Sequence, residues 1–388
     1  MASSERVDSD DQPTTPAVTV EATTEPGPDR AEPRTLGHVP ALDGVRGVAV
    51  LLVITTHLMI IFEPRLFFKV LPGAALGVDI FFVLSGFLIT SLLLGELRKS
   101  GRVSMRGFYK RRARRLLPAL VVLLVVHAYY AMLTDLPLKA ELQTAAASLF
   151  YVANWYRATG HTPAQGLSHL WSLSIEEQFY LVWPLMVVLF FGVRRSLRFS
   201  VVMLCTAIVA IVAWRAFLWG AATTHAQVGT LYYRTDTRAD GLLIGALASY
   251  LWVHGRVPKR GVSAFAWLAI AFIGYCVSRM ATNESFYYAG GFALVAAATA
   301  TIILAIVEGR WLGIRLFNLA LLRAVGRVSY GLYLWHVSVY FAVRRYLSAW
   351  PKPVEMIFAV AVAFAFTLAS RFLVENPFLS KTRREQKV

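Results

Sequence analysis

Ten apolar stretches divide this sequence, and nearly all of them are long enough to cross a bilayer as an α-helix. Lipid offers no hydrogen-bond partner to a peptide group, so long apolar segments cross it as helices that pair their own backbone. We therefore expect an all-α polytopic membrane protein with about ten transmembrane helices. The predicted spans are 42–62, 76–95, 116–133, 168–191, 199–219, 238–253, 262–280, 288–307, 328–346 and 354–373.

Two segments depart from this pattern. The sixth span is short and begins with polar residues, and the stretch 142–155 is too short to count, so we expect it at the interface or re-entering the membrane. The composition fits a membrane protein, since 57% of the residues are hydrophobic and only 16% are charged. Cys205 and Cys276 both lie in apolar runs, where we expect buried thiols rather than a disulfide framework or a cysteine-based zinc site.

Basic residues are unevenly distributed between the loops, and this predicts an orientation. With the N-terminus in the cytoplasm, the inner loops and the C-terminal tail carry 23 Lys and Arg residues. The outer side carries eight, counting Arg344 and Arg345 at a helix end. Ten spans with both termini in the cytoplasm therefore satisfy the positive-inside rule. We expect a multi-pass protein of a cell membrane, in particular a bacterial cytoplasmic membrane.

The two ends of the chain differ from the apolar region between them. Residues 1–40 hold three basic and eight acidic residues, are rich in Pro and Thr, and show no apolar periodicity. We predict a disordered acidic cytoplasmic tail over 1–40, a membrane domain over 41–377 and a basic cytoplasmic tail over 378–388. The remaining basic excess lies between apolar spans, so topology explains it and nucleic acid is not an expected partner.

The first span carries two ionisable residues, Arg46 and His57, although charged groups inside a bilayer are costly. They are eleven residues apart, which is three helical turns plus roughly 20° and about 16 Å along the axis. Both side chains therefore point the same way, with Arg46 near the cytoplasmic end and His57 nearer the outer end. The alternative is structural: Arg46 reaches lipid headgroups and His57 bonds a backbone carbonyl.

The second span places Asp79 near its outer start, at the depth expected for His57. A carboxylate there would orient the imidazole and fix its tautomer. The alternative for Asp79 is a helix cap. Ser85 lies further in on the same span, where local hydrogen bonding within the helix is the alternative to a role in a site.

The fourth span contains adjacent carboxylates, Glu176 and Glu177, in an apolar frame that begins at Trp171. Neighbouring residues on a helix face about 100° apart, so at most one of the two is expected to point easily into a given cavity. A structural ion pair with an arginine such as Arg238 is the alternative. His169 precedes this helix and is expected at the wet interface.

Further polar residues lie in the sixth and ninth spans. Arg238 and Asp240 open the sixth, where an ion pair with another helix is the plain interpretation. Tyr330 and His336 lie in the ninth, and His336 falls in mid-span, where a packed and hydrogen-bonded histidine is the alternative to a site residue. Together with Ser85 and Trp171, these four are candidates for substrate-binding or structural roles.

The loop before the third span is the most basic segment of the chain, with nine Lys and Arg residues in 96–115. Much of this charge sets the orientation and contacts anionic lipid. Arg111, Arg112 and Arg115 also form a cluster suited to a polyanionic ligand, because guanidinium groups bind phosphate through paired donors.

Six motifs in fixed order resemble the acyltransferase-3 family of integral-membrane acyltransferases. They are the R-x10-H pair of Arg46 and His57, then GVDIFFVLSGFLI, RRARRLLP, LWSLSIEEQFYLVWP, RADGLLIG and SYGLYLWH. The resemblance covers 42–377 and is O-acetyltransferase-like. It implies a ten-helix enzyme that moves an acyl group from cytoplasmic acyl-CoA to a hydroxyl of a carbohydrate, lipid-linked glycan, glycolipid or secondary metabolite. Acetyl-CoA is the expected donor and no metal is expected.

The resemblance also implies roles for individual residues. Arg46 and His57 match the signature pair, and Arg111, Arg112 and Arg115 match the arginine motif. Some relatives continue into an extracytoplasmic esterase-like domain, which this sequence is not expected to carry.

These residues suggest a mechanism, which stays a hypothesis. The arginines, with Arg46, would hold the donor phosphates, and the pantetheine arm would follow the first helix to His57. His57 would act as general base or carry the acyl group itself. Asp79, Glu176 or Glu177 would stabilise its imidazolium. The alternative function is a membrane transporter or flippase for a lipid-linked sugar or an acyl group, although no repeat or matched broken helices of the transporter kind are evident.

Overall fold

The computed structural model describes residues 34–191, 196–258 and 261–378. Helices and connecting loops make up all of this described part, and no β-strand occurs in it. Most of the two predicted tails, 1–33 and 379–388, lies outside it. The elements are α1 Pro40–Phe62, α2 Pro64–Val70, η1 Ala74–Leu76, α3 Gly77–Ser100, α4 Met105–Met132, α5 Leu138–Leu149, α6 Ala153–Ala158, η2 Gln165–Leu170, α7 Trp171–Phe191, α8 Leu197–Ala221, α9 His225–Leu231, α10 Thr235–Arg238, α11 Asp240–Val253, α12 Val262–Arg279, η3 Tyr287–Gly291, α13 Phe292–Glu308, α14 Ile314–Phe317, α15 Ala320–Arg327, α16 Ser329–Tyr346, α17 Lys352–Ser370 and η4 Arg371–Glu375.

Each of the ten predicted spans corresponds to a helix, namely α1, α3, α4, α7, α8, α11, α12, α13, α16 and α17. Over the described ranges, eight helical segments are long and apolar enough to cross a membrane. The other two are α11, which is only 14 residues long, and α16, which carries His336 and two arginines. The all-α class and the multi-pass membrane character are thereby confirmed. The stretch 142–155 folds as parts of the short helices α5 and α6.

Local sequence explains where several helices begin and end. Pro40 occupies the first turn of α1, where its missing N–H removes no hydrogen bond. Ser104 caps α4 by accepting from the N–H of Gly107 at 3.2 Å. Gly101 ends α3 at a φ of +71°, a left-handed conformation that glycine adopts without strain.

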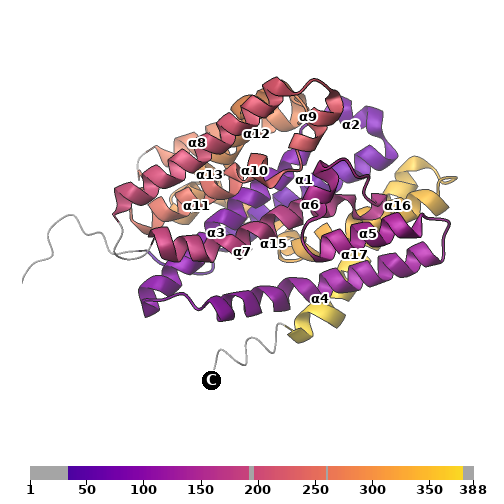
Figure 1. Ribbon diagram of the computed structural model, residues 1–388, viewed down its shortest axis with the longest axis horizontal. Coiled ribbons are helices and arrows are strands. Elements are labelled where there is room, and N and C mark those ends of the chain that lie inside the picture. The colour runs from indigo at the N-terminus through magenta and orange to yellow at the C-terminus, as the bar shows by residue number, and fades with distance from the viewer. Residues whose placement is uncertain (1–33, 192–195, 259–260, 379–388) are drawn as a thin grey trace, which may run out of the picture. The chain divides into compact units, whose positions relative to one another are not determined.

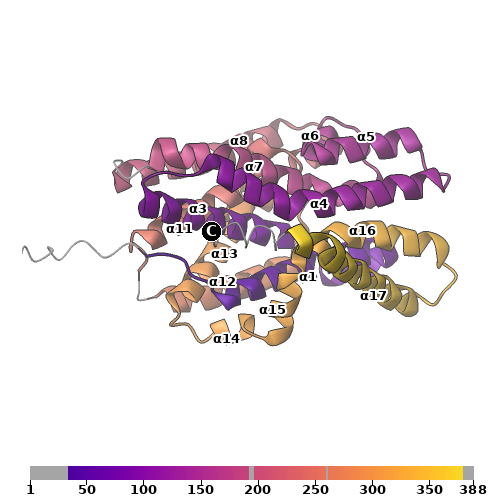
Figure 2. The same cartoon turned by 90° about the horizontal axis from the view of Figure 1, so that it is seen from below.

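The buried helix α3 packs closely against α1, α11 and α13. Glycines permit this approach: a Cβ on Gly86 would lie 1.9 Å from the Leu242 carbonyl oxygen, and one on Gly245 would lie 2.0 Å from that of Val83. Small residues at helix crossings bring backbones together in membranes, where lipid tails provide no hydrophobic drive. Figure 1 shows α1 and α3 between α8 at the top of the view and α4 at the bottom, and in the turned view of Figure 2 both α4 and α8 lie above α1.

Three helices form the periphery. In the apolar 18-residue stretch of α8 only 11% of the residues are buried, whereas 78% are buried in the corresponding stretch of α3. The apolar stretches of α12 and α17 are mostly exposed, like that of α8. Val202, Val209 and Phe217 of α8 are exposed, which suits a face in contact with lipid tails. Cys276 is buried as expected, but Cys205 is exposed on α8, so that prediction was wrong for one of the two thiols.

Candidate active site: an arginine pocket beside a histidine pocket

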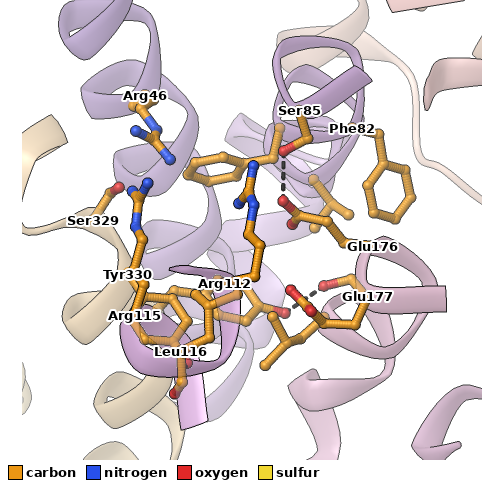
Figure 3. Close-up of a pocket in the computed structure, with 15 residues that line it drawn as sticks. Arg46, Phe82, Ser85, Arg112, Arg115, Leu116, Glu176, Glu177, Ser329 and Tyr330 are labelled. Carbon is orange, nitrogen blue, oxygen red and sulfur yellow. Dashed lines mark hydrogen bonds between the residues drawn. The ribbon is translucent and has the colours of Figure 1, made fainter. Parts of the chain in front are cut away.

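Residues of α1, α3, α4, α7 and α16 enclose a small cavity of about 60 Å³, here called the arginine pocket. Figure 3 shows guanidinium groups from two helices gathered at it, Arg46 from α1 and both Arg112 and Arg115 from α4. Its full lining is Arg46, Val78, Phe81, Phe82, Ser85, Arg112, Arg115, Leu116, Ser172, Leu173, Glu176, Glu177, Ser329, Tyr330 and Tyr333.

The cations of this pocket lack close counter-ions. Within the described chain, none of Arg46, Arg112 and Arg115 has a carboxylate within ion-pair distance. Arg112 instead stacks on the ring of Tyr180, with its guanidinium carbon 4.2 Å from the ring centroid. Arg115 is exposed, whereas Arg46 and Arg112 are half-buried. The same cavity is lined by Glu176 and Glu177, so its three guanidinium groups exceed its carboxylates by one, and their forked donors match phosphate oxygens.

The arginines of α4 differ in their contacts. Arg112 and Arg115 line the arginine pocket, whereas Arg111 does not, although it lies four residues before Arg115 and helical periodicity alone would put those two on one face. Arg111 places its Nη2 3.3 Å from a carboxylate oxygen of Glu96 and does not line the cavity. The predicted arginine cluster is thus only partly at the pocket.

Both glutamates of α7 line the arginine pocket, although we expected at most one of them to do so easily. Ser85 donates to Oε1 of Glu176 at 2.5 Å (Figure 3). The Tyr180 hydroxyl donates to the same oxygen. Oε1 of Glu177 is buried and has no hydrogen-bond partner in the described structure. The cavity lies between the directions of the two side chains, so an angle of about 100° does not exclude either.

A second cavity of about 390 Å³, the histidine pocket, adjoins the first. His57 and His169 face it together with a ring of aromatic residues. The lining consists of Val53, Thr56, His57, Ile60, Ile61, Ala75, Val78, Arg157, Ser168, His169, Trp171, Gly229, Tyr232, Tyr233, Thr282, Asn283, Tyr288, Tyr333 and Phe341.

Hydrogen bonds fix the tautomer of His57. Its Nδ1 lies 3.0 Å from the carbonyl oxygen of Val53 and 3.2 Å from Nε2 of His336. Nδ1 of His336 lies 3.0 Å from the carbonyl oxygen of Leu332. Carbonyls only accept, so both Nδ1 atoms carry the proton and Nε2 of His336 accepts from His57. Nε2 of His57 is left with its lone pair and has no partner among the described residues.

His169 completes a group of three imidazoles. Its ring centroid lies 6.2 Å from that of His57 and 5.0 Å from that of His336. The side chain is buried and its Nε2 lies 3.2 Å from the Leu334 carbonyl oxygen, so the prediction of a wet interfacial histidine was wrong. In the part of the chain that the structure describes, no group of His, Cys, Asp and Glu is arranged to hold a metal ion.

Tyr333 forms the wall between the two pockets, since it lines both, as does Val78. Its hydroxyl donates to the carbonyl oxygen of His169 at 2.5 Å and lies 2.5 Å from Oγ of Ser172, which then donates to it. Ser172 faces the arginine pocket and His169 faces the histidine pocket. The Tyr333 hydroxyl thus forms hydrogen bonds with one residue of each pocket.

The remaining candidates have structural contacts. Asp79 bonds Nη2 of Arg238 at 2.8 Å, and Asp240 bonds Nη1 of Arg215 at 2.8 Å, all four being buried. Asp79 therefore does not orient His57, and Arg238 pairs with neither glutamate of α7, so both of those expectations were wrong. Desolvation explains the pairing, because a buried charge requires a close partner.

Trp171 and Tyr330 fall on different pockets. Trp171 lines the histidine pocket and packs against Tyr232 and Tyr233, with ring centroids 5.0 and 5.2 Å away. Tyr330 lines the arginine pocket and donates its hydroxyl to the Leu116 carbonyl oxygen at 2.7 Å.

Comparison with known proteins identifies the family. Residues 39–373 match the family model described as an acyltransferase domain. The peptidoglycan O-acetyltransferase OatA of Listeria monocytogenes is 32% identical over 356 residues, covering 88% of this chain and 56% of that protein. A "Putative O-acetyltransferase" of Staphylococcus aureus (strain COL) is 32% identical, covering 88% of this chain and 57% of that protein. A "Putative peptidoglycan O-acetyltransferase" of Bacillus subtilis is 36% identical over 326 residues, covering 78% and 48%.

This chain therefore spans about half the length of the curated relatives that it matches. No solved structure matches it. The matched residues include every helix that contributes to the two pockets. On this evidence the chain belongs to the acyltransferase domain family, the family that its six motifs resemble.

Proposed function

We propose that this protein transfers an acetyl group from acetyl-CoA to a hydroxyl group of a cell-envelope carbohydrate. The single observation that carries the proposal is the adjacency of two pockets across Tyr333. One presents three guanidinium groups, none of them within ion-pair distance of a carboxylate among the described residues, and the other presents the free Nε2 of His57. A donor with phosphates at one end and a thioester at the other would match this pair.

The donor would bind by its charge. Arg46, Arg112 and Arg115 would contact the phosphates, with exposed Arg115 at the approach. A cavity of about 60 Å³ is smaller than usual ligand sites, so only the narrow pantetheine arm would pass through it. The separation of Arg46 and His57, about 16 Å along α1, suits an extended arm of this kind.

His57 would supply the proton chemistry. Acting as a base, its Nε2 takes the proton of the acceptor hydroxyl while that oxygen bonds the carbonyl carbon. The carbon–sulfur bond breaks and the thiolate takes up a proton, which yields CoA and the ester. In the covalent alternative, the same Nε2 attacks the carbonyl carbon and expels the CoA thiolate. The acceptor hydroxyl oxygen then displaces the acetyl group from His57, and its proton passes to the thiolate, which yields CoA and the ester. Both routes need the lone pair on Nε2 of His57, which is free because Nδ1 carries the proton.

The proposed class of acceptor is taken from the names of the relatives. The protein from Listeria is named a peptidoglycan O-acetyltransferase, and that name motivates a carbohydrate of the cell envelope as acceptor here. The orientation with Arg46 towards the cytoplasm and His57 towards the outside would let a cytoplasmic donor serve an acceptor beyond the membrane.

Purified protein incubated with acetyl-labelled acetyl-CoA and envelope carbohydrate provides the test. We expect label in an alkali-labile ester on the carbohydrate. Acyl-independent flux of a lipid-linked sugar through the reconstituted protein, without ester formation, would support the transporter alternative instead. Mass spectrometry of glycans from cells with and without the gene would identify the acetylated hydroxyl.

A further inference from the structure

A third cavity of about 670 Å³ lies beside the histidine pocket, between α4, α5, η2 and α16. We call it the outer cavity. Phe341 of α16 lines both it and the histidine pocket, so the two are neighbours. Its volume lies within the usual range for ligand sites. The lining is His127, Tyr130, Leu136, Pro137, Ala140, Glu141, Thr162, Pro163, Ala164, Gln165, Gly166, Ser338, Phe341, Arg344 and Arg345.

A buried acid–base pair forms part of this wall. Nε2 of His127 on α4 lies 2.6 Å from Oε2 of Glu141 on α5, and both side chains are about 5% exposed. His127 is fifteen residues beyond Arg112 on α4, about 22 Å along the helix. The pair therefore lies at the end of the molecule away from the arginine pocket, on the side of His57.

This pair retains hydrogen-bonding capacity. Nδ1 of His127 and Oε1 of Glu141 have no hydrogen-bond partner among the described residues, and both residues line the cavity. A pair that only joined α4 to α5 would not need a cavity of this size beside it. Both atoms are accessible and not sealed in the protein interior, so they can donate to or accept from a polar ligand in the cavity.

We propose that the outer cavity binds the sugar next to the one that is acetylated, so that the acceptor is an oligosaccharide or polysaccharide. This rests on the proposed function, because it extends an acceptor site that begins at His57. Sugar hydroxyls would bond Nδ1 of His127 and Oε1 of Glu141. Tyr130 and Phe341 would pack against the apolar face of the ring.

The charges at the rim fit a neutral or acidic carbohydrate. Arg344 is paired with buried Glu355 at 3.1 Å. Arg345 is 40% exposed and lies 4.0 Å from Asp135, which is fully exposed, so it is available to an acidic substituent. A single sugar or a small metabolite at His57 would leave this entire cavity unused.

The test is the dependence of acetylation and binding on acceptor length. Oligosaccharides of β-1,4-linked N-acetylglucosamine with one, two and four sugars serve as probes, with acetyl-CoA as donor. In the wild type we expect KM to fall by about tenfold from one sugar to two, the value of one or two added hydrogen bonds. Binding of the same series, measured by calorimetry, should show the same step.

Two tryptophan substitutions on α5 form a matched pair. Ala140→Trp fills the outer cavity, whereas Ala146→Trp makes the same change at an exposed position that lines none of the cavities described above. We expect Ala140→Trp to abolish the gain from the second sugar while KM for acetyl-CoA stays unchanged. Ala146→Trp should behave like the wild type. An unchanged length dependence in Ala140→Trp overturns the inference.

His127→Gln tests the pair itself, since the amide still donates to Glu141 but presents different atoms to the cavity. It should raise KM for the disaccharide by about tenfold and leave KM for the single sugar unchanged. If this variant does not fold, Ala140→Trp decides alone. A wild type that treats all lengths alike, or binds none of them, also overturns the inference. Label transfer to envelope carbohydrate would then still uphold the proposed function, whereas absence of any transfer removes both.

Discussion

Nδ1 of His57 lies 3.2 Å from Nε2 of His336, across the contact between α1 and α16. The two residues are 279 positions apart in the sequence. Because His336 donates its own Nδ1 proton to the carbonyl of Leu332, it can only accept from His57. The Nδ1 proton of His57 is therefore held both by the Val53 carbonyl of its own helix and by a residue on another helix, and the free lone pair of Nε2 faces the histidine pocket.

Replacing His57 should remove the chemistry and leave binding intact. We expect His57→Gln to lower kcat for acetyl transfer by at least about 100-fold, the usual contribution of a positioned base. Binding of acetyl-CoA at the arginine pocket should be unchanged, because that pocket is not lined by His57. Transfer assays and equilibrium binding on the same preparation measure both. Full transfer by His57→Gln would exclude both the general-base and the acyl-histidine routes.

His336 should act as a positioning residue. His336→Asn retains a polar side chain near the Leu332 turn but is too short to accept from His57, so only the Val53 carbonyl then holds the orientation of the His57 ring. We expect kcat to fall by about tenfold while KM for acetyl-CoA and for the acceptor stays the same. His336→Gln, whose longer amide can accept from His57, should recover part of the loss. Equal changes in kcat and both KM values, with no recovery, would indicate a packing role alone.

The arginines of α4 offer a comparison within one motif. Arg115→Gln removes a cation that lines the arginine pocket, and Arg111→Gln removes one that faces Glu96 instead. We expect Arg115→Gln and Arg46→Gln each to raise KM for acetyl-CoA about tenfold or more, as for lost charge-assisted hydrogen bonds. Arg111→Gln should have little effect. Equal increases in KM for acetyl-CoA in Arg111→Gln and Arg115→Gln would mean that the arginine motif acts by setting the membrane orientation or by contacting lipid.

The sequence alone predicted those features that depend on one helix. Hydropathy located the ten helices, and helical periodicity placed Arg46 and His57 on one face. Contacts between helices could not be derived in this way. Asp79 and Arg238 are 159 residues apart, and nothing local indicates that they meet. His169 was missed as a site residue because it lies at the start of the fourth predicted span, which suggested an interface. Its cluster with His57 and His336 depends on tertiary packing.

The pair of Asp79 and Arg238 should contribute to stability. Both side chains are buried, so Asp79→Asn leaves an uncompensated guanidinium among Tyr232 and Phe292. Breaking a buried ion pair costs about 3–5 kcal/mol, and we expect a clear fall in the unfolding temperature of the detergent-solubilised protein. The double change Asp79→Leu with Arg238→Met should recover much of that loss, because no charge remains buried. A double variant less stable than either single one would contradict this account.

Tyr333 should control coupling between the two pockets. Tyr333→Phe keeps the ring but removes the bonds to Ser172 and to the His169 carbonyl, which loosens the partition. Water could then enter through the loosened partition and reach the thioester beside His57 more readily, and we expect hydrolysis of acetyl-CoA without acceptor to rise relative to transfer. Tyr330→Phe is the matched control, since its hydroxyl bonds Leu116 and of the two pockets it lines only the arginine pocket. Free CoA is measured with and without carbohydrate. An identical ratio of hydrolysis to transfer in both variants and the wild type would show that the partition does not depend on the Tyr333 hydroxyl.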